Sequence, residues 1–210
     1  MDRRDAAELL ENPSLPSAAV AEAYRELDRT HFWLGNTAAI FRRLRRARPA
    51  TVLDLGCGQG ALLQKIQRKF GATVTGFDLR PAPDSSAVPI LAGDAVSDPL
   101  PRADIALAVC LVHHLPEADI VRLIRNVSRS CRRFIILDPV RHWLPLRLFK
   151  ICVAPFLGSI NAVDGVTSIR RSYTPRELQR IVNRAVEGTG ARVRYSVAPL
   201  YIRQIADISW

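Results

Sequence analysis

Several kinds of segment are missing from this 210-residue chain. Its first residues lead into no apolar segment of the signal-peptide type, and no uninterrupted apolar stretch is long enough to span a bilayer. We therefore expect a cytoplasmic protein. The four cysteines, Cys57, Cys110, Cys131 and Cys152, form neither a C-x-x-C pair nor a cluster with histidine at zinc spacing. This spacing predicts reduced core thiols, without a disulfide framework and without a metal site.

Lysine is scarce as well, so arginine carries most of the formal net charge of +10. A strongly basic chain is often a nucleic-acid-binding protein. However, the densest arginine cluster, residues 42–48, contains apolar residues at helical spacing, which favours a solvated helix face. An RNA-binding motif with interleaved aromatic residues is also missing. The sequence thus disfavours a nucleic-acid partner without excluding one.

From residue 51 onward, short apolar runs alternate with helical patterns. We expect strands at 51–55, 72–77, 88–91, 104–110 and 133–137, and helices at 60–70, 116–129 and 175–186. The last of these helices starts with a capping-box pattern, Thr174 with Glu177. Such alternation, with right-handed crossovers, predicts a parallel, doubly wound α/β sheet. Two final strands, at 191–197 and 201–208, are joined too tightly for a crossover helix, so they should pair antiparallel.

The remaining segments differ from this alternation. We expect helices at 5–11, 17–30 and 34–47, a turn at 81–84, an N-terminal helical cap over 1–48 and a main domain over 49–210. Residues 139–173 are expected to be a lid inserted in the main domain, with a loop at 161–167. Its run 143–160 is unusually apolar, which indicates an apolar or aromatic substrate and a peripheral contact with membranes. An ordinary buried helix or a dimer contact would explain the same run.

A glycine-rich turn follows the first strand of the alternation. Val52 to Leu55 form an apolar run, Gly56, Gly58 and Gly60 follow, and a helical pattern begins directly after them. Glycine lets the backbone approach a ligand closely, and a helix N-terminus offers unpaired N–H groups. The same residues also fit a loose dinucleotide fingerprint. Asp54 disfavours that alternative, because a pyrophosphate at this turn would meet its carboxylate, whereas a ligand with an ammonium group would be attracted.

The pattern Asp54-x-Gly56-x-Gly58-x-Gly60 behind a Val-Leu strand resembles motif I of the class I S-adenosylmethionine (SAM) dependent methyltransferases. The resemblance covers residues 51–138. It implies a Rossmann-like, mostly parallel seven-stranded sheet with one antiparallel strand, SAM as cofactor, and methyl transfer to a small hydrophobic or aromatic acceptor, with O-methylation favoured. An RNA or other macromolecular methyltransferase, an NAD(P)-dependent oxidoreductase and a non-catalytic protein of this fold remain as alternatives. A monomer and a homodimer are both open.

Ligands of doubly wound sheets bind beyond the carboxyl ends of the strands. Asp78 ends the second strand, where a carboxylate suits a ribose diol, and Asp94 follows the third. The resemblance implies that Asp94 and the Ala95 N–H contact adenine, and that backbone near Cys110 flanks the methionine part of SAM. The full set of expected cofactor-binding residues is Asp54, Gly56, Cys57, Gly58, Gly60, Asp78, Leu79, Asp94, Ala95, Cys110, Leu111 and Val112.

Methyl transfer to oxygen benefits from a base beside the acceptor. The segment Leu111-Val112-His113-His114-Leu115 resembles one that is common in small-molecule methyltransferases, and Asp138 and His142 follow the fifth strand at the same edge. We expect the catalytic residues among His113, His114, Asp138 and His142, with packing or helix capping as the alternative role. Candidate substrate contacts are Trp33, Asn36, Arg170 and Tyr173.

Overall fold

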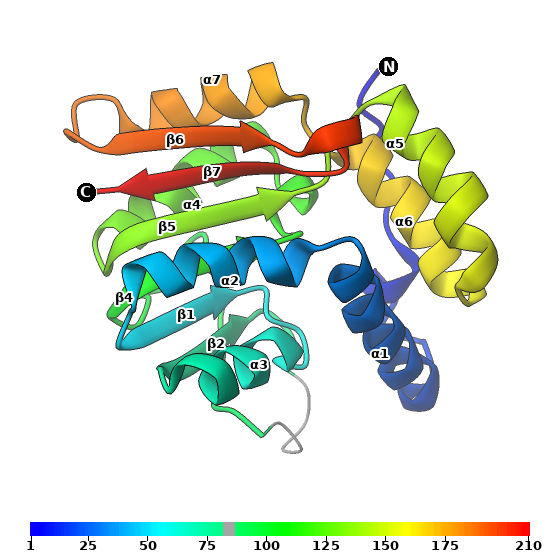
Figure 1. Cartoon of the computed structure of the whole chain (residues 1–210), viewed down its shortest axis with the longest axis horizontal. Coiled ribbons are helices and arrows are strands. Elements are labelled where there is room, and N and C mark those ends of the chain that lie inside the picture. Colours follow the sequence, from blue (N-terminus) through cyan, green and yellow to red (C-terminus); the bar gives the residue numbers. More distant parts are fainter. Residues whose placement is uncertain (82–86) are drawn as a thin grey trace.

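The computed structural model describes residues 1–81 and 87–210. Its centre is a seven-stranded sheet with the strand order β3-β2-β1-β4-β5-β7-β6 (Figure 1). The strands are β1 Thr51–Leu55, β2 Thr73–Asp78, β3 Ile90–Ala92, β4 Ala103–Val109, β5 Cys131–Asp138, β6 Arg192–Val197 and β7 Gln204–Ser209. The α-helices are α1 Ser17–Trp33, α2 Asn36–Ala47, α3 Ala61–Phe70, α4 Glu117–Ser128, α5 Trp143–Leu148, α6 Ser159–Arg171 and α7 Pro175–Val186. Shorter helical turns are η1 Leu9–Glu11, η2 Val112–His114, η3 Phe149–Val153, η4 Ala154–Phe156 and η5 Pro199–Tyr201.

The strand directions confirm the predicted fold class. Strands β1 to β5 pair in parallel, whereas β7 is antiparallel to both of its neighbours, β5 and β6. In the central register, Leu55 lies opposite Phe77 on one side and Ala108 on the other. The carboxyl ends of β1, β2 and β4 are therefore level, and the residues that follow them meet at one edge of the sheet.

Helices cover both faces of this sheet, as the apolar spacing predicts. On one face α2 and α3 pack Ile40, Leu44 and Ile66 against alternate strand residues such as Val52. On the other face α4 and α7 pack against residues of the opposite parity, such as Leu53. Because successive side chains of a strand point to opposite faces, each strand contributes side chains to the core on both faces of the sheet. The central strands β1, β4 and β5 are consequently a mostly buried frame that fixes the carboxyl edge of the sheet.

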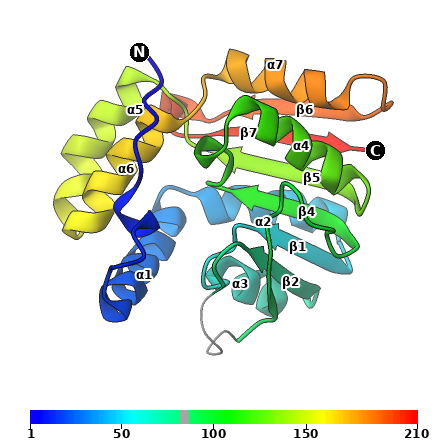
Figure 2. The same ribbon diagram turned by 180° about the vertical axis from the view of Figure 1, so that it is seen from behind.

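A third group of helices, α1, α5 and α6, lies beyond that carboxyl edge instead of covering a face (Figure 1). Figure 2 shows the N-terminal segment running across α6 before the chain enters α1. Backbone bonds fasten the crossing, since the Arg4 N–H donates to the Arg170 carbonyl at 3.2 Å. None of the described helices is long and apolar enough to cross a membrane.

The helix expected at 5–11 is wrong, because only Leu9–Glu11 form a single 3-10 turn. The backbone N–H groups of Leu9 and Leu10 donate to the carboxylate of Asp164, at 2.6 and 3.0 Å. Those donors are thus bonded to a distant element and not to a preceding turn of helix. The local pattern could not contain this contact, which joins positions more than 150 residues apart.

The loop expected at 161–167 is also wrong, since these residues lie within α6. Glycine and β-branched residues lower the helix propensity of the segment. Packing reverses that preference, because Gly165 lies against the ring of Phe149, where a side chain would collide. Asn161 adds a bond from its side chain to the Ala23 carbonyl of α1, at 2.9 Å.

Other expected features hold or change in detail. The capping box at the start of α7 is confirmed, with Thr174 and Glu177 making both reciprocal bonds. The division at residue 48 stays a prediction; within residues 1–48, α2 packs on the sheet and α1 lies beyond its edge. Residues 82–84 of the expected turn at 81–84 lie outside the described residues.

Candidate cofactor and acceptor sites

The turn after β1 brings other side chains close to Gly56 and Gly58. At Gly58, with φ of +54°, an added Cβ would lie 2.6 Å from the ring of Tyr24 on α1. At Gly56, with φ of +68°, an added Cβ would lie 2.8 Å from the side chain of Leu111. Asp78 holds the turn from β2, because its carboxylate accepts a 2.8 Å hydrogen bond from the Gly58 N–H. Only glycine adopts this conformation without strain.

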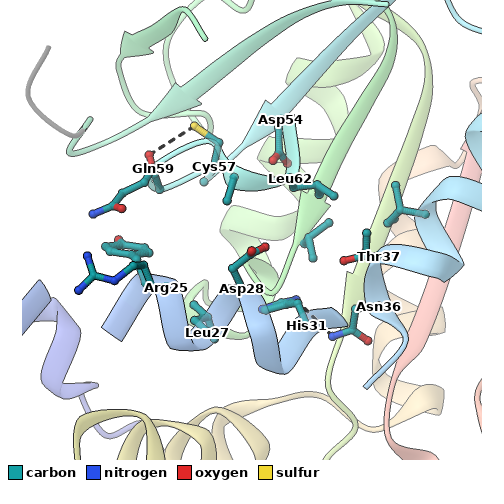
Figure 3. A pocket seen from close by; sticks show the side chains of 16 residues that line it. Arg25, Leu27, Asp28, His31, Asn36, Thr37, Asp54, Cys57, Gln59 and Leu62 are labelled. Atoms are coloured by element: carbon teal, nitrogen blue, oxygen red, sulfur yellow. Dashed lines mark hydrogen bonds between the residues drawn. The ribbon is translucent and has the colours of Figure 1, made fainter. Parts of the chain in front are cut away.

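A cavity of about 200 Å³, cavity 1, lies between this turn and α1. Figure 3 shows Asp54 on the sheet side of the cavity and Asp28 and His31 facing it from α1. The cavity is lined from the sheet and its turn by Asp54, Gly56, Cys57, Gly58 and Val109, and from α1 and α2 by Tyr24, Leu27, Asp28, His31, Asn36 and Thr37, among others. The structure thereby joins three predicted motif I residues to a helix that the motif does not include.

Asp54 gives cavity 1 its distinctive chemistry. Its side chain is buried, and burial together with the charge of Asp78 raises the pKa of Asp54 to about 8. A carboxyl group in this state is largely protonated near neutral pH. A cationic ligand group beside it would stabilise the ionised form. The cavity therefore favours a ligand with a positive charge over one with a phosphate.

Helix α1 is tied over cavity 1 by one ion pair. The Lys65 ammonium on α3 bonds to both carboxylate oxygens of Asp28, at 2.6 and 2.7 Å. His31, one turn further along α1, contacts Asn36 through Nδ1 at 3.3 Å. Burial lowers the pKa of His31 to about 4, so its ring is neutral near pH 7. Arg25 also lines the cavity from α1, where its guanidinium pairs with Glu22 of the same helix at 2.7 Å.

Comparisons with known proteins agree with this geometry. Residues 52–133 match the model of a family described as a methyltransferase domain. Human N-acetylserotonin methyltransferase, solved in complex with SAM, is similar with a TM-score of 0.59 and 18% identity, over 95% of this chain and 61% of that one. Residues 52–133 thus carry the similarity to methyltransferases, and the sheet has the fold of an enzyme solved with SAM. SAM is the cofactor of that family.

Three further proteins are similar to this chain. The plantazolicin methyltransferase BpumL, solved with a monoazolic desmethylPZN analog and S-adenosylhomocysteine (SAH), has a TM-score of 0.70 at 14% identity, over 95% of this chain and 91% of that one. Acetylserotonin O-methyltransferase of Rattus norvegicus is 33% identical over 96 residues, which are 39% of this chain and 22% of that protein.

A human probable bifunctional dTTP/UTP pyrophosphatase/methyltransferase protein is 29% identical over 98 residues, which are 41% of this chain and 16% of its own length. The chain thus matches about a fifth of the length of these curated relatives. The family model covers residues 52–133, which contain motif I.

A second cavity of about 160 Å³, cavity 2, opens beside the first in the methyltransferase domain. Leu27, His31 and Asn36 line both cavities, so the two adjoin at these residues. Most of the wall of cavity 2 is apolar. Its apolar residues include Leu34 after α1, Phe149 and Leu157, Ile169 of α6, and Ile202 after η5. One end is polar and contains Glu8, His113 and His114, next to Cys110.

The polar end of cavity 2 is a chain of close contacts. His113 Nδ1 lies 3.0 Å from a carboxylate oxygen of the fully buried Asp138. On its other side, His113 Nε2 lies 3.4 Å from Glu8 Oε1. Burial alone would lower the pKa of His113, but Asp138 and Glu8 raise it to about 9. His113 therefore holds a proton at neutral pH, and Asp138 and Glu8 orient its ring from opposite sides.

Several predicted cofactor contacts lie outside both cavities. Asp78 bonds to the N–H groups of Gly58 and Arg80, so it shapes the turn. Asp94 accepts bonds from the Val96 N–H and the Ser97 hydroxyl, at 2.9 and 3.0 Å, within its own turn. The side chain of Leu79 is exposed and that of Val112 is fully buried. Their contacts with SAM, like those of Gly60, Ala95 and Leu111, stay predictions.

The predicted catalytic and substrate residues divide in a similar way. His113, His114 and Asn36 line cavity 2, and Asp138 contacts His113. His142 instead caps α5, since its Nδ1 accepts a 3.2 Å bond from the Leu144 N–H. The remaining three candidates lie away from both cavities: Trp33 is 82% exposed, Arg170 lines neither, and the buried Tyr173 donates its hydroxyl to the Leu115 carbonyl at 2.7 Å.

Residues that sequence reasoning missed supply the second wall of each cavity. Tyr24, Asp28 and His31 come from α1, and Glu8 comes from the N-terminal segment. The helical pattern at 17–30 predicted α1 but not which of its faces meets the motif I turn. No local sequence pattern pointed to Glu8, because its contact residues His113 and Ser168 are 105 and 160 positions away in the chain.

Proposed function

We propose that this methyltransferase domain transfers a methyl group from SAM to an oxygen atom of a small, apolar or aromatic acceptor bound in cavity 2. The observation that carries the proposal is the junction of the two cavities at Leu27, His31 and Asn36. One cavity has the motif I turn and a buried carboxyl group, and the other has an apolar wall that ends in histidines. Such a pair suits a donor and an acceptor held side by side.

The residues of cavity 1 fit SAM. The backbone cradle at Gly56 and Gly58 admits a ligand at close range, and Asp54 matches an ammonium group. When bound, SAM supplies an electrophilic methyl group. The chain contributes position, since holding a nucleophile in line with such a carbon accounts for a large part of the barrier reduction.

Cavity 2 fits a hydrophobic acceptor with one polar group. Its volume of about 160 Å³ suits a small molecule rather than a folded partner. We assign orientation of the acceptor oxygen to His113 and His114, with Asp138 as the group that positions the His113 ring. The division into a cap at 1–48 and a lid at 139–173 is part of the same proposal, because α1, α5 and α6 enclose the carboxyl edge of the sheet.

The experiment is a transfer assay with methyl-labelled SAM and a fixed panel of acceptors: naphthols, hydroxyquinones, aromatic amines, short-chain fatty acids and transfer RNA. We expect label in the naphthols or hydroxyquinones. Ile169→Trp, which fills cavity 2 from α6, should raise the KM for that acceptor about tenfold or more and leave the affinity for SAH unchanged. Val163→Trp on the exposed side of the same helix is the matched control. Methylation of transfer RNA alone would overturn the proposal.

A further inference from the structure

We propose that Glu8, His113 and His114 form a binding site for one divalent transition-metal ion, such as Zn²⁺ or Mn²⁺, at the polar end of cavity 2. One carboxylate oxygen of Glu8 and one ring nitrogen of each histidine lie within 4.8 Å of one another. Two imidazoles and one carboxylate are a donor set that suits such ions and leaves coordination positions open. The sequence alone predicted no metal site, because Glu8 is far from the histidines along the chain.

The spacing of the donor atoms is close to what coordination requires. Tetrahedral zinc with bonds of about 2.0–2.1 Å has donors roughly 3.3 Å apart. Here Glu8 Oε1 lies 3.4 Å from His113 Nε2, and Glu8 Oε2 lies 3.9 Å from His114 Nε2. Small side-chain movements would therefore bring all three groups to one ion. Ser168 already holds Glu8 in place, since its hydroxyl donates to Oε1 at 2.5 Å.

Both histidines have the outer contacts that metal ligands typically make. His113 Nδ1 lies 3.0 Å from Asp138, and His114 Nδ1 lies 2.8 Å from Glu11. A carboxylate at Nδ1 fixes the ring and turns Nε2 toward the ion. The ligating nitrogen would be Nε2 in each case, and both Nε2 atoms face Glu8.

The buried His113 Nε2 makes no hydrogen bond of normal geometry among the described residues, although Glu8 Oε1 lies 3.4 Å away. His113 itself is 1% exposed, so water does not readily satisfy this atom. A buried polar atom without a partner normally marks a missing ligand, ion or water. This observation is independent of the clustering of acidic and basic groups, and it is the one that points to a bound ion.

The charges around the site also suit a dication. Glu8, Glu11 and Asp138 carry negative charges, and Arg171 pairs with Glu11 at 2.6 Å while lying 3.3 Å from His114 Nδ1. A bound dication would replace the proton that His113 holds at neutral pH, because a metal-ligating histidine is neutral. A proton shared between His113 and its two carboxylates would be the competing explanation, and it predicts that no metal binds.

The role of the ion rests on the proposed function. Its open positions would face cavity 2, where an acceptor oxygen could bind and lose its proton more easily. Binding of the ion itself does not depend on that role. Its test can therefore fail or succeed separately from the transfer assay.

The test is calorimetric titration of the full chain, cleared of metal with a chelator, with ZnCl₂, MnCl₂ and MgCl₂ in the absence of SAM and acceptor. A Cys152→Ser background removes the exposed thiol as a competing ligand. We expect one equivalent of Zn²⁺ to bind, Mn²⁺ to bind more weakly, and Mg²⁺, which prefers oxygen donors, to bind weakest.

Variants decide where the ion binds. Glu8→Gln and His114→Gln should each weaken Zn²⁺ binding at least about tenfold, and Asp138→Asn should weaken it by about 10–100-fold through the His113 ring. His142→Gln, a histidine outside the cluster, should leave Zn²⁺ binding unchanged. Thermal unfolding and SAH affinity report whether each variant is folded. An absence of Zn²⁺ binding, or equal binding by wild type, Glu8→Gln and His114→Gln, would overturn the site.

Discussion

Folding stability and ligand binding favour opposite protonation states of Asp54. Its carboxyl group is buried at the end of β1, and its pKa is raised to about 8. An acid with a raised pKa in the folded state favours folding while protonated, and this contribution is lost as the pH rises through the folded value. The penalty for ionised Asp54 therefore accumulates between about pH 4 and pH 8. A bound ammonium group would offset it.

The pH dependence of SAH binding tests this account. Because the ionised carboxylate is the form that attracts an ammonium group, the affinity of the wild type should rise by up to about tenfold per pH unit between pH 6 and pH 8. Asp54→Asn should bind SAH more weakly at pH 8 and lose most of that slope. Calorimetric titration at each pH measures both quantities.

The same variant should be more stable than the wild type at pH 8, and the difference in Tm should shrink toward pH 5, where Asp54 is protonated anyway. Asp104→Asn is the matched control. Its carboxylate accepts bonds from Ala50 and Thr51 at the opposite end of the sheet, and burial is not its dominant influence. That variant should lose stability but keep the SAH affinity and its pH slope. A wild-type affinity that is flat from pH 6 to pH 8 would contradict the role of Asp54.

At the level of elements, α1 decides the shape of cavity 1. The helix brings Tyr24 against the glycine turn and His31 to the junction of the cavities. Its tether to the sheet layer is the Lys65–Asp28 pair, in which both side chains are about a quarter to a third exposed. Pairs with this exposure contribute up to about 1 kcal/mol. The pair thus favours the position of α1 over cavity 1, but it is too weak to hold the helix there permanently.

Removing the tether should weaken cofactor binding more than stability. In Lys65→Met, the loss of about 1 kcal/mol from the closed position of α1 corresponds to an SAH affinity about fivefold lower. Lys69→Met on the same helix is the control, since the described contact of Lys69 is with the ring of Phe41 on α2. Equal SAH affinities for the two variants would contradict the role of the pair. Calorimetry with SAH separates them.

The whole molecule consists of a rigid sheet with two covered faces and a group of helices at its carboxyl edge (Figures 1 and 2). The sheet core is fully buried, whereas α1 has a single buried residue, Ala23. Regions with few buried contacts open at lower free energy than the core. A ligand between the two parts should therefore stabilise the edge helices most.

Hydrogen exchange with and without SAH tests this expectation. At a concentration of about 100 times Kd, the ligand should add roughly 2.7 kcal/mol to the stability of the closed state. We expect slower exchange in α1 and in residues 56–63, and no change in α7, which lines neither cavity. Protection spread evenly over α1 and α7 would indicate general stabilisation and not closure of cavity 1.

The periodic parts of the molecule could be predicted from the sequence, because their signals are local. Strand β1, the glycine turn and the start of α7 depend on apolar spacing, positive φ angles and a capping box, and each of these is contained in a few neighbouring residues. The level carboxyl ends of β1, β2 and β4 then bring Asp54, Asp78 and the segment after β4 to one edge. The fold and the cofactor followed from these features.

The acceptor side depended on contacts between segments far apart in the chain. Only the tertiary structure placed Glu8 at His113, turned residues 161–167 into helix against Phe149, and set α1 over the turn. No local pattern encodes these contacts, since the burial and charge that select them exist only after the chain has folded. The sequence by itself determined the sheet, its ligand edge and motif I, whereas packing at that edge determined the cavities and the Glu8–His113–His114 cluster.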